Sequence, residues 1–246
     1  MASTIRTDKI GPADGSADFT LPTADGSAKS ALITDGSKAL SFATGTPSAS
    51  NFLRGDGTWA VPASDSDIVK ISSGHLTGAG TISVDGHFSS TYLNYRIIFD
   101  SMLTDTDDSD VNIRVNTSGS ADTSSNYTYA SARTYINSSA VSAVDSTKSG
   151  FNQDKWLFDD GLEDDNKPAV IDLMIYNPLS TSVTKVMMCD FWNLYSSGTQ
   201  YNNHRVGMNW NQTTALTGVT IFLSSGNFET STDTSKNNWT LYGYKN

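Results

Sequence analysis

The sequence predicts an all-β protein, with a short extended N-terminal anchor or stalk followed by an antiparallel, jelly-roll-like β-sandwich. Three observations support this fold class. Asp-Gly turn signals recur in the first quarter of the chain. Beyond residue 66, short runs rich in β-branched and aromatic residues alternate between apolar and polar positions. Helical periodicity is nearly absent, and successive strands without helices between them favour an antiparallel sandwich.

The composition fits one large β domain with an appendage, within a chain of 246 residues. Apolar residues other than Gly make up 37%, which stays below the roughly 45–50% of ordinary soluble domains even when allowance is made for the Gly counted in that range. The net charge of −10 repels phosphate backbones, so we expect no nucleic-acid partner. No stretch approaches the roughly 20 apolar residues of a membrane span, so we expect no membrane insertion. The single cysteine, Cys189, excludes an intrachain disulfide, and its apolar neighbours predict a buried thiol.

The N-terminal quarter is punctuated by four Asp-Gly dipeptides, which begin at Asp14, Asp25, Asp35 and Asp56, at spacings of 11, 10 and 21 residues. Asp-Gly favours turns because Gly accepts positive φ and Asp hydrogen-bonds to its own backbone. The apolar pieces between the turns are too short to bury their own faces, which predicts a shaft shared by several chains. The side chains expected to build it are Phe19, Leu21, Leu32, Ile33, Leu40, Phe42, Phe52, Leu53 and Trp59.

A polar bridge at residues 62–67 predicts the boundary between a stalk segment, residues 1–62, and a β-sandwich, residues 66–246. The first strands of the sandwich follow at residues 67–72 and 80–86, between Gly and Asp turns. Residues 92–99 are a stronger strand, rich in β-branched and aromatic residues, and residues 111–116 alternate cleanly.

The rest of the sandwich follows the same pattern with one interruption. Residues 127–133 are expected to form another strand of the same kind. We expect a long loop with one short helix at residues 134–166. Four further segments then read as strands, and the first of them stops at Asn177-Pro178. These segments are residues 169–176, 183–195 (one long strand or a bent pair), 205–210 and 219–224, with a last strand at 238–244. The total is about nine or ten strands.

Two N-terminal segments resemble the repeats of bacteriophage tail-fibre and related virion appendage proteins. They are FTLPTADGSAKSALITDGSKALSF at residues 19–42 and GTPSASNFLRGDGTWAVP at residues 45–62. The closing stretch, residues 218–245, is similar to the last strands of the jelly-roll-like tip domains in such proteins. With only three or four repeat units, the shaft would be short, which favours a short fibre, a tailspike-like appendage or a head or vertex fibre.

The resemblance implies a homotrimer located in the virion, with residues 1–62 docked to other virion proteins and residues 66–246 as the tip. A threefold axis agrees with the short apolar pieces, because three chains can bury them together and remove exposed strand edges. The tip would bind a host cell-surface glycan or protein by contact rather than by chemistry. The alternatives are a head-decorating fibre without a host-binding role, a tailspike-type depolymerase and a monomeric lectin module.

Aromatic side chains with amide neighbours are the candidate receptor contacts, because sugars stack on aromatic faces and hydrogen-bond to amides. Residues 201–204 are expected to form an exposed loop. The full set of candidates is Tyr195, Tyr201, Asn202, Asn203, His204, Tyr127 and Tyr129. By contrast, we expect Trp192, Trp210 and Trp239 in the core.

The other candidate sites are better explained by loop and turn structure than by a binding function. The run Asp105, Asp107, Asp108 and Asp110 lacks the Gly and distal Glu of an EF-hand, so we expect a solvated loop, with a structural calcium or magnesium ion as the alternative. A second acidic cluster at residues 159–165 has the same interpretation. Turn chemistry explains the tripeptide at residues 54–56, Arg-Gly-Asp. No G-x-S-x-G, H-E-x-x-H or P-loop motif is present, so we expect a protein that is not an enzyme and needs no cofactor.

Overall fold

The computed structural model of the chain forms two units, Met1–Asp65 and Ser66–Asn246, and their boundary falls within the predicted polar bridge. The structure describes residues 9–10, 19–20, 22, 30–34, 40–45, 48–61, 66–76, 78–136, 141–162, 167–195, 200–230 and 236–245. None of these residues is helical. Within these ranges, no helix is present that is long and apolar enough to cross a membrane.

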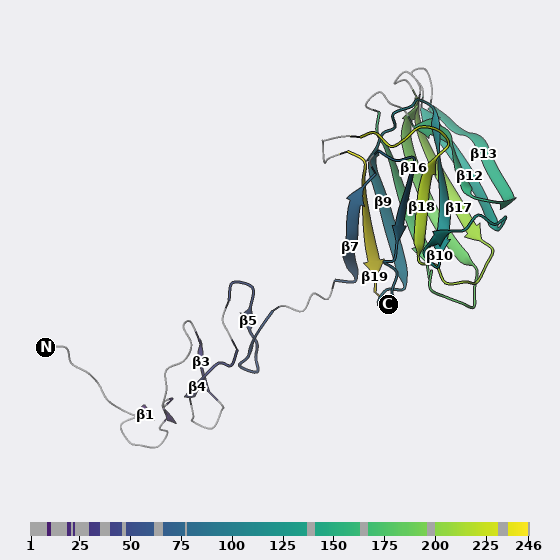
Figure 1. Cartoon of the computed structure of the whole chain (residues 1–246). Coiled ribbons are helices and arrows are strands. Elements are labelled where there is room, and N and C mark those ends of the chain that lie inside the picture. The colour runs from purple at the N-terminus through teal and green to yellow at the C-terminus, as the bar shows by residue number, and fades with distance from the viewer. Residues whose placement is uncertain are drawn as a thin grey trace. The chain divides into compact units, whose positions relative to one another are not determined.

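The N-terminal unit contains three small antiparallel ribbons of two strands each (Figure 1). Their pairs are β1 (Lys9–Ile10) with β2 (Phe19–Thr20), β3 (Leu32–Thr34) with β4 (Leu40–Phe42), and β5 (Phe52–Leu53) with β6 (Trp59–Ala60). These strands have two or three residues, so each ribbon has little apolar surface to pack.

The apolar side chains predicted to build the shaft are poorly covered within this unit. Leu32, Phe52 and Leu53 are exposed, by 51%, 45% and 37%. The side chains of Ile33, Leu40, Phe42 and Trp59 are half-buried. The side chain of Phe19 and all of Leu21 lie outside the described residues.

The Asp56-Gly57 dipeptide forms the turn that its sequence predicts. The Asp56 carboxylate accepts hydrogen bonds from the backbone N–H of Thr58, at 3.0 Å, and from its hydroxyl, at 2.7 Å. Gly57 has a φ of +80°, a conformation that side chains disfavour. The other three Asp-Gly dipeptides lie outside the described residues.

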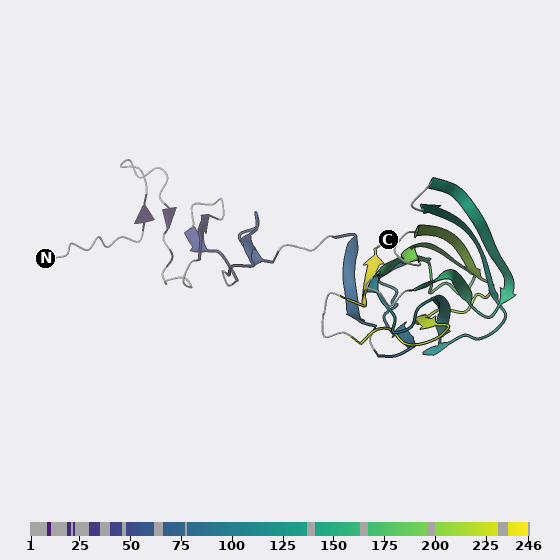
Figure 2. The same cartoon turned by 90° about the horizontal axis from the view of Figure 1, so that it is seen from above.

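The second unit is a sandwich of two antiparallel sheets, so the predicted all-β antiparallel sandwich is confirmed. The larger sheet has eight strands in the order β13 (Val141–Gln153), β12 (Tyr127–Ile136), β17 (Gln200–Trp210), β16 (Lys185–Tyr195), β15 (Ala169–Tyr176), β9 (Asn94–Met102), β19 (Asn238–Tyr244) and β7 (Ile68–His75). Figure 2 shows β13 and β7 at opposite edges of this sheet.

The smaller sheet has five strands. Its order is β11 (Ser120–Ala121), β10 (Ser109–Thr117), β18 (Gly218–Leu223) and β8 (Thr81–Asp85), with β14 (Trp156–Leu162) also paired to β10. The long loop and short helix predicted at residues 134–166 are wrong, because this region contains β13 and β14. Residues 201–204 are also not a loop, since they lie within β17.

The core lies between the two sheets and follows the period-two alternation of their strands. On β9, Tyr95, Ile97 and Phe99 are fully buried, and Val111 and Ile113 of β10 are buried from the other layer. Each large side chain buried in this way contributes about 1.5–3 kcal/mol relative to an exposed one. The predicted burial of Cys189 is confirmed, and burial raises the pKa of its thiol.

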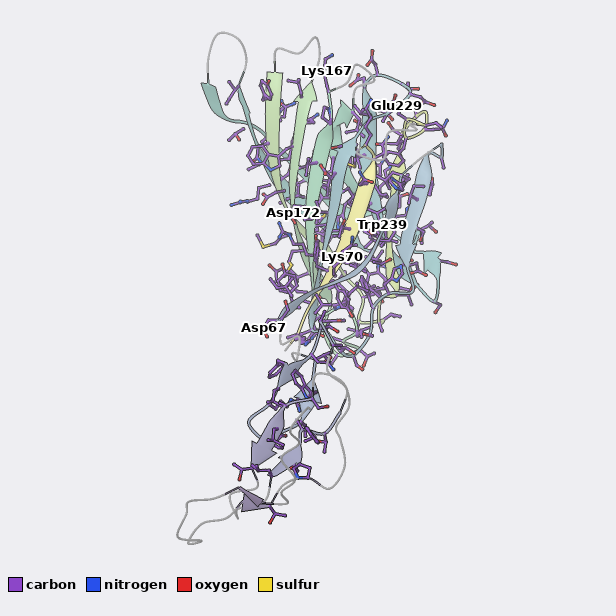
Figure 3. All side chains as sticks on the ribbon, turned by 90° about the vertical axis from the view of Figure 1, so that its left-hand side faces the viewer. Asp67, Lys70, Lys167, Asp172, Glu229 and Trp239 are labelled. Atoms are coloured by element: carbon purple, nitrogen blue, oxygen red, sulfur yellow. The ribbon has the colours of Figure 1, made fainter. Side chains whose placement is uncertain are left out.

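The sandwich has two distinct ends along its strands. The chain enters beside its own C-terminal strand, where the N–H of Lys245 donates to the carbonyl of Asp67 at 2.9 Å. Figure 3 shows Asp67 at this entry end and Lys167 at the opposite, far end, with Asp172 between them. Each cross-strand row on the larger sheet can therefore be described as nearer the entry end or nearer the far end.

Candidate functional site: an aromatic hollow on the outer sheet face

The larger sheet has a core-facing side and an outer face, and β16 shows the alternation most clearly. Its side chains at Met187, Cys189 and Phe191 are buried in the core. Between them, Val186, Met188 and Trp192 point the other way and are 49%, 46% and 57% exposed. A strand sends successive side chains to opposite faces, so these three residues belong to the outer face.

A hollow of about 420 Å³ lies on the outer face near the far end of the sandwich. Its wall is almost entirely apolar. The residues that line it are Ile136, Pro168, Val170, Trp192, Asn193, Leu194, Tyr201 and Asn202. They come from three neighbouring strands, β12, β17 and β16, and from the start of β15.

Register places the aromatic residues of this hollow in two adjacent cross-strand rows. Tyr201 pairs with Ile136 on one side and with Leu194 on the other. In the next row, Trp192 pairs with Asn203 and with Val170. Side chains directly opposite on one face of an antiparallel pair lie about 4.5–5.5 Å apart at Cβ, so these residues form one continuous patch.

The patch offers two ring faces to solvent with an amide beside them. Tyr201 is 60% exposed and Trp192 is 57% exposed, whereas aromatic side chains of this size are usually buried. Asn203 is half-buried in the same row as Trp192. Rings held on strands, with an adjacent amide, can stack on the apolar face of a sugar or hold an apolar side chain of a partner.

A band of charges crosses the outer face next to this patch. Asp172 and Asp190 lie directly opposite each other on β15 and β16, where like charges repel. Arg205 compensates Asp190 through two hydrogen bonds, at 2.9 and 3.3 Å. Arg96 compensates Asp172 through a bidentate pair of hydrogen bonds, with its Nε at 2.7 Å from the carboxylate. The Asp172 carboxylate raises the pKa of Arg96.

Two of the predicted receptor contacts lie on the outer face, namely Tyr201 and Asn203. His204 and Asn202 are 3% and 2% exposed and point into the sandwich, so the prediction is wrong for His204, and Asn202 takes part only as a buried residue at the wall of the hollow. They alternate with Tyr201 and Asn203 because the segment is a strand rather than a loop. Tyr195 is the last residue of β16, and its side chain lies outside the described set.

The prediction is also wrong for Tyr127 of β12, whereas for Tyr129 of the same strand it stays a prediction. Tyr127 is fully buried and meets Trp156 edge to face, with ring centroids 4.9 Å apart. Its hydroxyl donates to the carbonyl of Asp122 at 2.7 Å and accepts from the N–H of Val115 at 3.2 Å. Tyr129 is half-buried and packs against the same core.

Trp192 is the functional candidate that the sequence interpretation missed, since it was expected in the core. The expectation is confirmed for Trp210 and Trp239, which are 3% and 9% exposed. The alternation of buried and exposed positions along this strand is the signal that predicts an exposed Trp192. Cys189 is buried and Asp190 favours solvent, so Trp192, two residues after Asp190, is placed on the solvent side.

The Asp105 run forms a turn that is held by hydrogen bonds from the protein. Asp105 accepts from the backbone N–H of Asn227 at 2.7 Å, from its side-chain amide at 3.1 Å and from the hydroxyl of Thr106 at 3.0 Å. These bonds, with the backbone bond first, hold the pKa of Asp105 below its ordinary value.

The other carboxylates of the two acidic segments are placed as follows. Asp107 and Asp108 continue the turn of Asp105, and Asp110 lies within β10. Across the described ranges, no three His, Cys, Asp or Glu side chains group as metal ligands do. The side chains of the second acidic cluster, residues 159–165, lie almost wholly outside those ranges, so its ion-binding alternative stays a prediction.

Comparison of this chain with models of protein families, with curated proteins and with solved structures finds no match.

Proposed function

We propose that this chain is a structural and adhesive protein of a phage virion. In this proposal it forms a short trimeric fibre or appendage. Residues 1–62 build the stalk and dock to other virion proteins, and residues 66–246 form the tip. The tip holds a host cell-surface glycan or protein by contact, without catalysis. The observation that carries the adhesive role is the hollow around Trp192 and Tyr201.

The position of the hollow supports an adhesive tip. It lies near the far end of the sandwich, opposite the end where the preceding segment enters. A surface at that end lies away from the point where the sandwich joins the preceding segment, so this junction does not cover it. The rings are fixed on strands paired on both sides, which holds a binding surface in place better than loops do.

The N-terminal unit supports the multi-chain stalk. Its ribbons leave Leu32, Phe52 and Leu53 exposed, and other chains can cover them. Several copies on one appendage also add avidity, so that each tip contact can be weak. The FLRGDGTW segment, with its resemblance to fibre proteins, agrees with this arrangement.

The adhesive role is tested with the full-length protein, labelled with a fluorophore and incubated with a panel of bacterial strains and their purified surface polysaccharides. We expect saturable binding to at least one strain, and a loss of at least about tenfold in affinity for Trp192→Ala. The control is Trp192→Phe, which keeps a ring for stacking. Equal binding by the Trp192→Ala variant and the unaltered chain would exclude the hollow as the receptor contact.

Two further measurements distinguish this proposal from a head-decorating fibre and from a tailspike-type depolymerase. Gold-labelled antibody to the sandwich, applied to intact particles, places the protein on the tail or on the head. Incubation with host polysaccharide, followed by an assay for new reducing ends, tests the depolymerase alternative. A chain that is absent from purified particles would contradict the proposed function as a whole.

A further inference from the structure

The far-end hollow, which is the one around Trp192 and Tyr201, has no charged side chain among the described residues that line it. Lys167 precedes Pro168 in the chain but is not part of the lining. The two cross-strand rows that build the hollow are also uncharged from β12 to β15. These rows are Ile136, Tyr201 and Leu194, and Thr134, Asn203, Trp192 and Val170.

The two arginines of the charged band are already engaged. Arg205 lies one row from Trp192 and is hydrogen-bonded to Asp190, at 2.9 and 3.3 Å. Arg96 is bonded in the same way to Asp172. The chain as a whole has a net charge of −10. A carboxylate or phosphate that entered the hollow would therefore lose its water without gaining a cation, which is strongly unfavourable. The hollow is suited to an uncharged ligand.

The wall of the hollow also restricts which part of a ligand can enter. Apart from the two rings it is mainly aliphatic, with Ile136, Val170 and Leu194 among the residues that line it. A hydroxyl group placed against these side chains would lose its hydrogen bonds to water without replacement. A methyl group loses none and buries apolar surface instead. The part of the ligand that enters the hollow is therefore expected to bear a methyl group.

Uncharged hydrogen-bonding groups lie beside the Trp192 ring, in its own row. Thr134 on β12 is exposed and pairs with Asn203 on β17, which pairs in turn with Trp192 on β16. A hydroxyl, an amide and a ring therefore follow one another across three neighbouring strands. A pyranose sugar has two matching surfaces, because its C–H face stacks on aromatic rings and its edge carries hydroxyl groups.

The size of the uncharged area favours a sugar over a protein partner. Two outer-face rows on four strands measure about 13 Å along the strands and about 19 Å across them, or roughly 250 Å². The charged row of Asp190 and Arg205 borders this area. A standard protein–protein contact covers about 800 Å² on each partner. The hollow itself, at about 420 Å³, lies within the range of about 300–1,000 Å³ that is usual for sites of small ligands.

We propose that the far-end hollow holds an uncharged glycan unit whose buried part bears a methyl group, as a 6-deoxyhexose does. The sugar stacks on Trp192, with its hydroxyl edge toward Asn203 and Thr134. This assignment rests on the proposed adhesive function and specifies the class of receptor. It excludes sugars that carry a carboxylate or phosphate at the hollow, and it excludes a protein receptor.

The test uses the full chain, a bacterial strain to which it binds, and soluble polymers that carry one kind of sugar as competitors. In each set of three the sugars share one ring and differ only in the group at C6, which is a methyl, a hydroxymethyl or a carboxylate. The sets are built on galactose, glucose and mannose. In the set that inhibits binding, we expect the methyl sugar to act at about tenfold lower concentration than the hydroxymethyl sugar. The carboxylate sugar should need a concentration at least about tenfold higher than the hydroxymethyl sugar.

A designed cation tests the charge selection directly. Thr134→Arg places a guanidinium in the row of Asn203 and Trp192, and it should improve inhibition by the carboxylate sugar at least about fivefold. The matched control is Thr81→Arg, at an exposed position of β8 in the smaller sheet, which changes the net charge equally. The control should keep the order of the three sugars unchanged. Equal behaviour of the two variants would contradict the placement of the sugar along this row.

Three results would overturn the assignment. They are inhibition by the carboxylate sugar that equals or exceeds inhibition by the methyl sugar, no inhibition by any set, and adhesion that is lost when the cells are treated with protease but survives periodate oxidation of their glycans. In each case, adhesion that still depends on Trp192 would leave the proposed function intact and reject only the ligand class. Adhesion that is unchanged in Trp192→Ala would contradict the receptor contact itself.

Discussion

Trp192 and Asn203 lie directly opposite each other on β16 and β17, and both side chains stand on the outer face of the larger sheet. The pairing sets a ring face and an amide side by side on two strands that are hydrogen-bonded along their length. The backbone that carries both groups is already fixed by strand pairing before a ligand arrives, which lowers the entropic cost of binding. The exposed ring is therefore the group on which the proposed receptor contact depends most.

The first prediction compares Trp192 with its neighbour in sequence. Trp192→Ala should lower the free energy of unfolding by about 1–2 kcal/mol, less than the loss of a buried ring, because the Trp192 ring is more than half exposed. Phe191→Ala should cost about 3–5 kcal/mol, because that ring is fully buried and meets Phe158, with centroids 5.6 Å apart. Urea unfolding followed by fluorescence measures both, and a large loss for Trp192→Ala would assign the ring a structural role.

Trp192 and Phe191 also show which features of burial can be predicted from the sequence alone. Alternation along residues 111–116 predicted a strand with one apolar face, and Val111, Ile113 and Val115 of β10 are fully buried. The same alternation, applied to residues 189–192, predicts an exposed Trp192. The general burial habit of tryptophan pointed the other way and was wrong here, because position on a strand decides which face a residue joins.

The strands missed between residues 134 and 166 have a different cause. Among the described strands, β13 is an edge strand paired with β12, and its sequence VSAVDSTKSGFNQ has little of the apolar alternation that marks a half-buried strand. Its pairing depends on backbone hydrogen bonds to β12, the strand that precedes it in the chain, and not on an apolar pattern of its own. The outer-face hollow was equally inaccessible to prediction, since it needs the register of strands far apart in sequence.

The second prediction concerns Lys185, a fully buried cation whose ammonium group is held by backbone alone. It donates to the carbonyls of Ser180, Val183 and Thr213, at 2.6, 3.0 and 3.1 Å, and so joins two loops. Lys185→Met keeps the volume but leaves three carbonyls without this donor, and we expect a loss of about 3 kcal/mol in urea unfolding. Lys70→Met, at an exposed position, is the control and should cost less than about 0.5 kcal/mol.

The third prediction concerns the charged band. Removing Arg96 leaves Asp172 facing Asp190 without its compensating partner. A double-mutant cycle of Arg96→Gln and Asp172→Asn should give a coupling of about 1 kcal/mol, since both side chains are partly exposed. The cycle for Arg205 and Asp190 should give less, because Arg205 is 70% exposed. Both couplings should shrink in 1 M salt, for which the screening length is about 3 Å.

The last prediction uses the pH dependence of stability at Tyr127. Burial raises the pKa of this hydroxyl well above its ordinary value near 10, with the nearby Asp122 charge as a second cause. Above about pH 10 the unfolded chain therefore loses a proton that the folded chain keeps. Folding then becomes less favourable as the pH rises, by up to about 1.4 kcal/mol for each pH unit.

Tyr127→Phe removes that pH-dependent loss but has a cost of its own at neutral pH. The hydroxyl donates to Asp122 and accepts from Val115, and its removal leaves both backbone groups without this partner, which should cost about 1–2 kcal/mol at pH 7. The stability difference between the variant and the unaltered chain should therefore narrow between pH 10 and 11. Tyr201→Phe, at an exposed site, is the control. A difference that stays constant with pH would show that the Tyr127 hydroxyl ionises equally in both states.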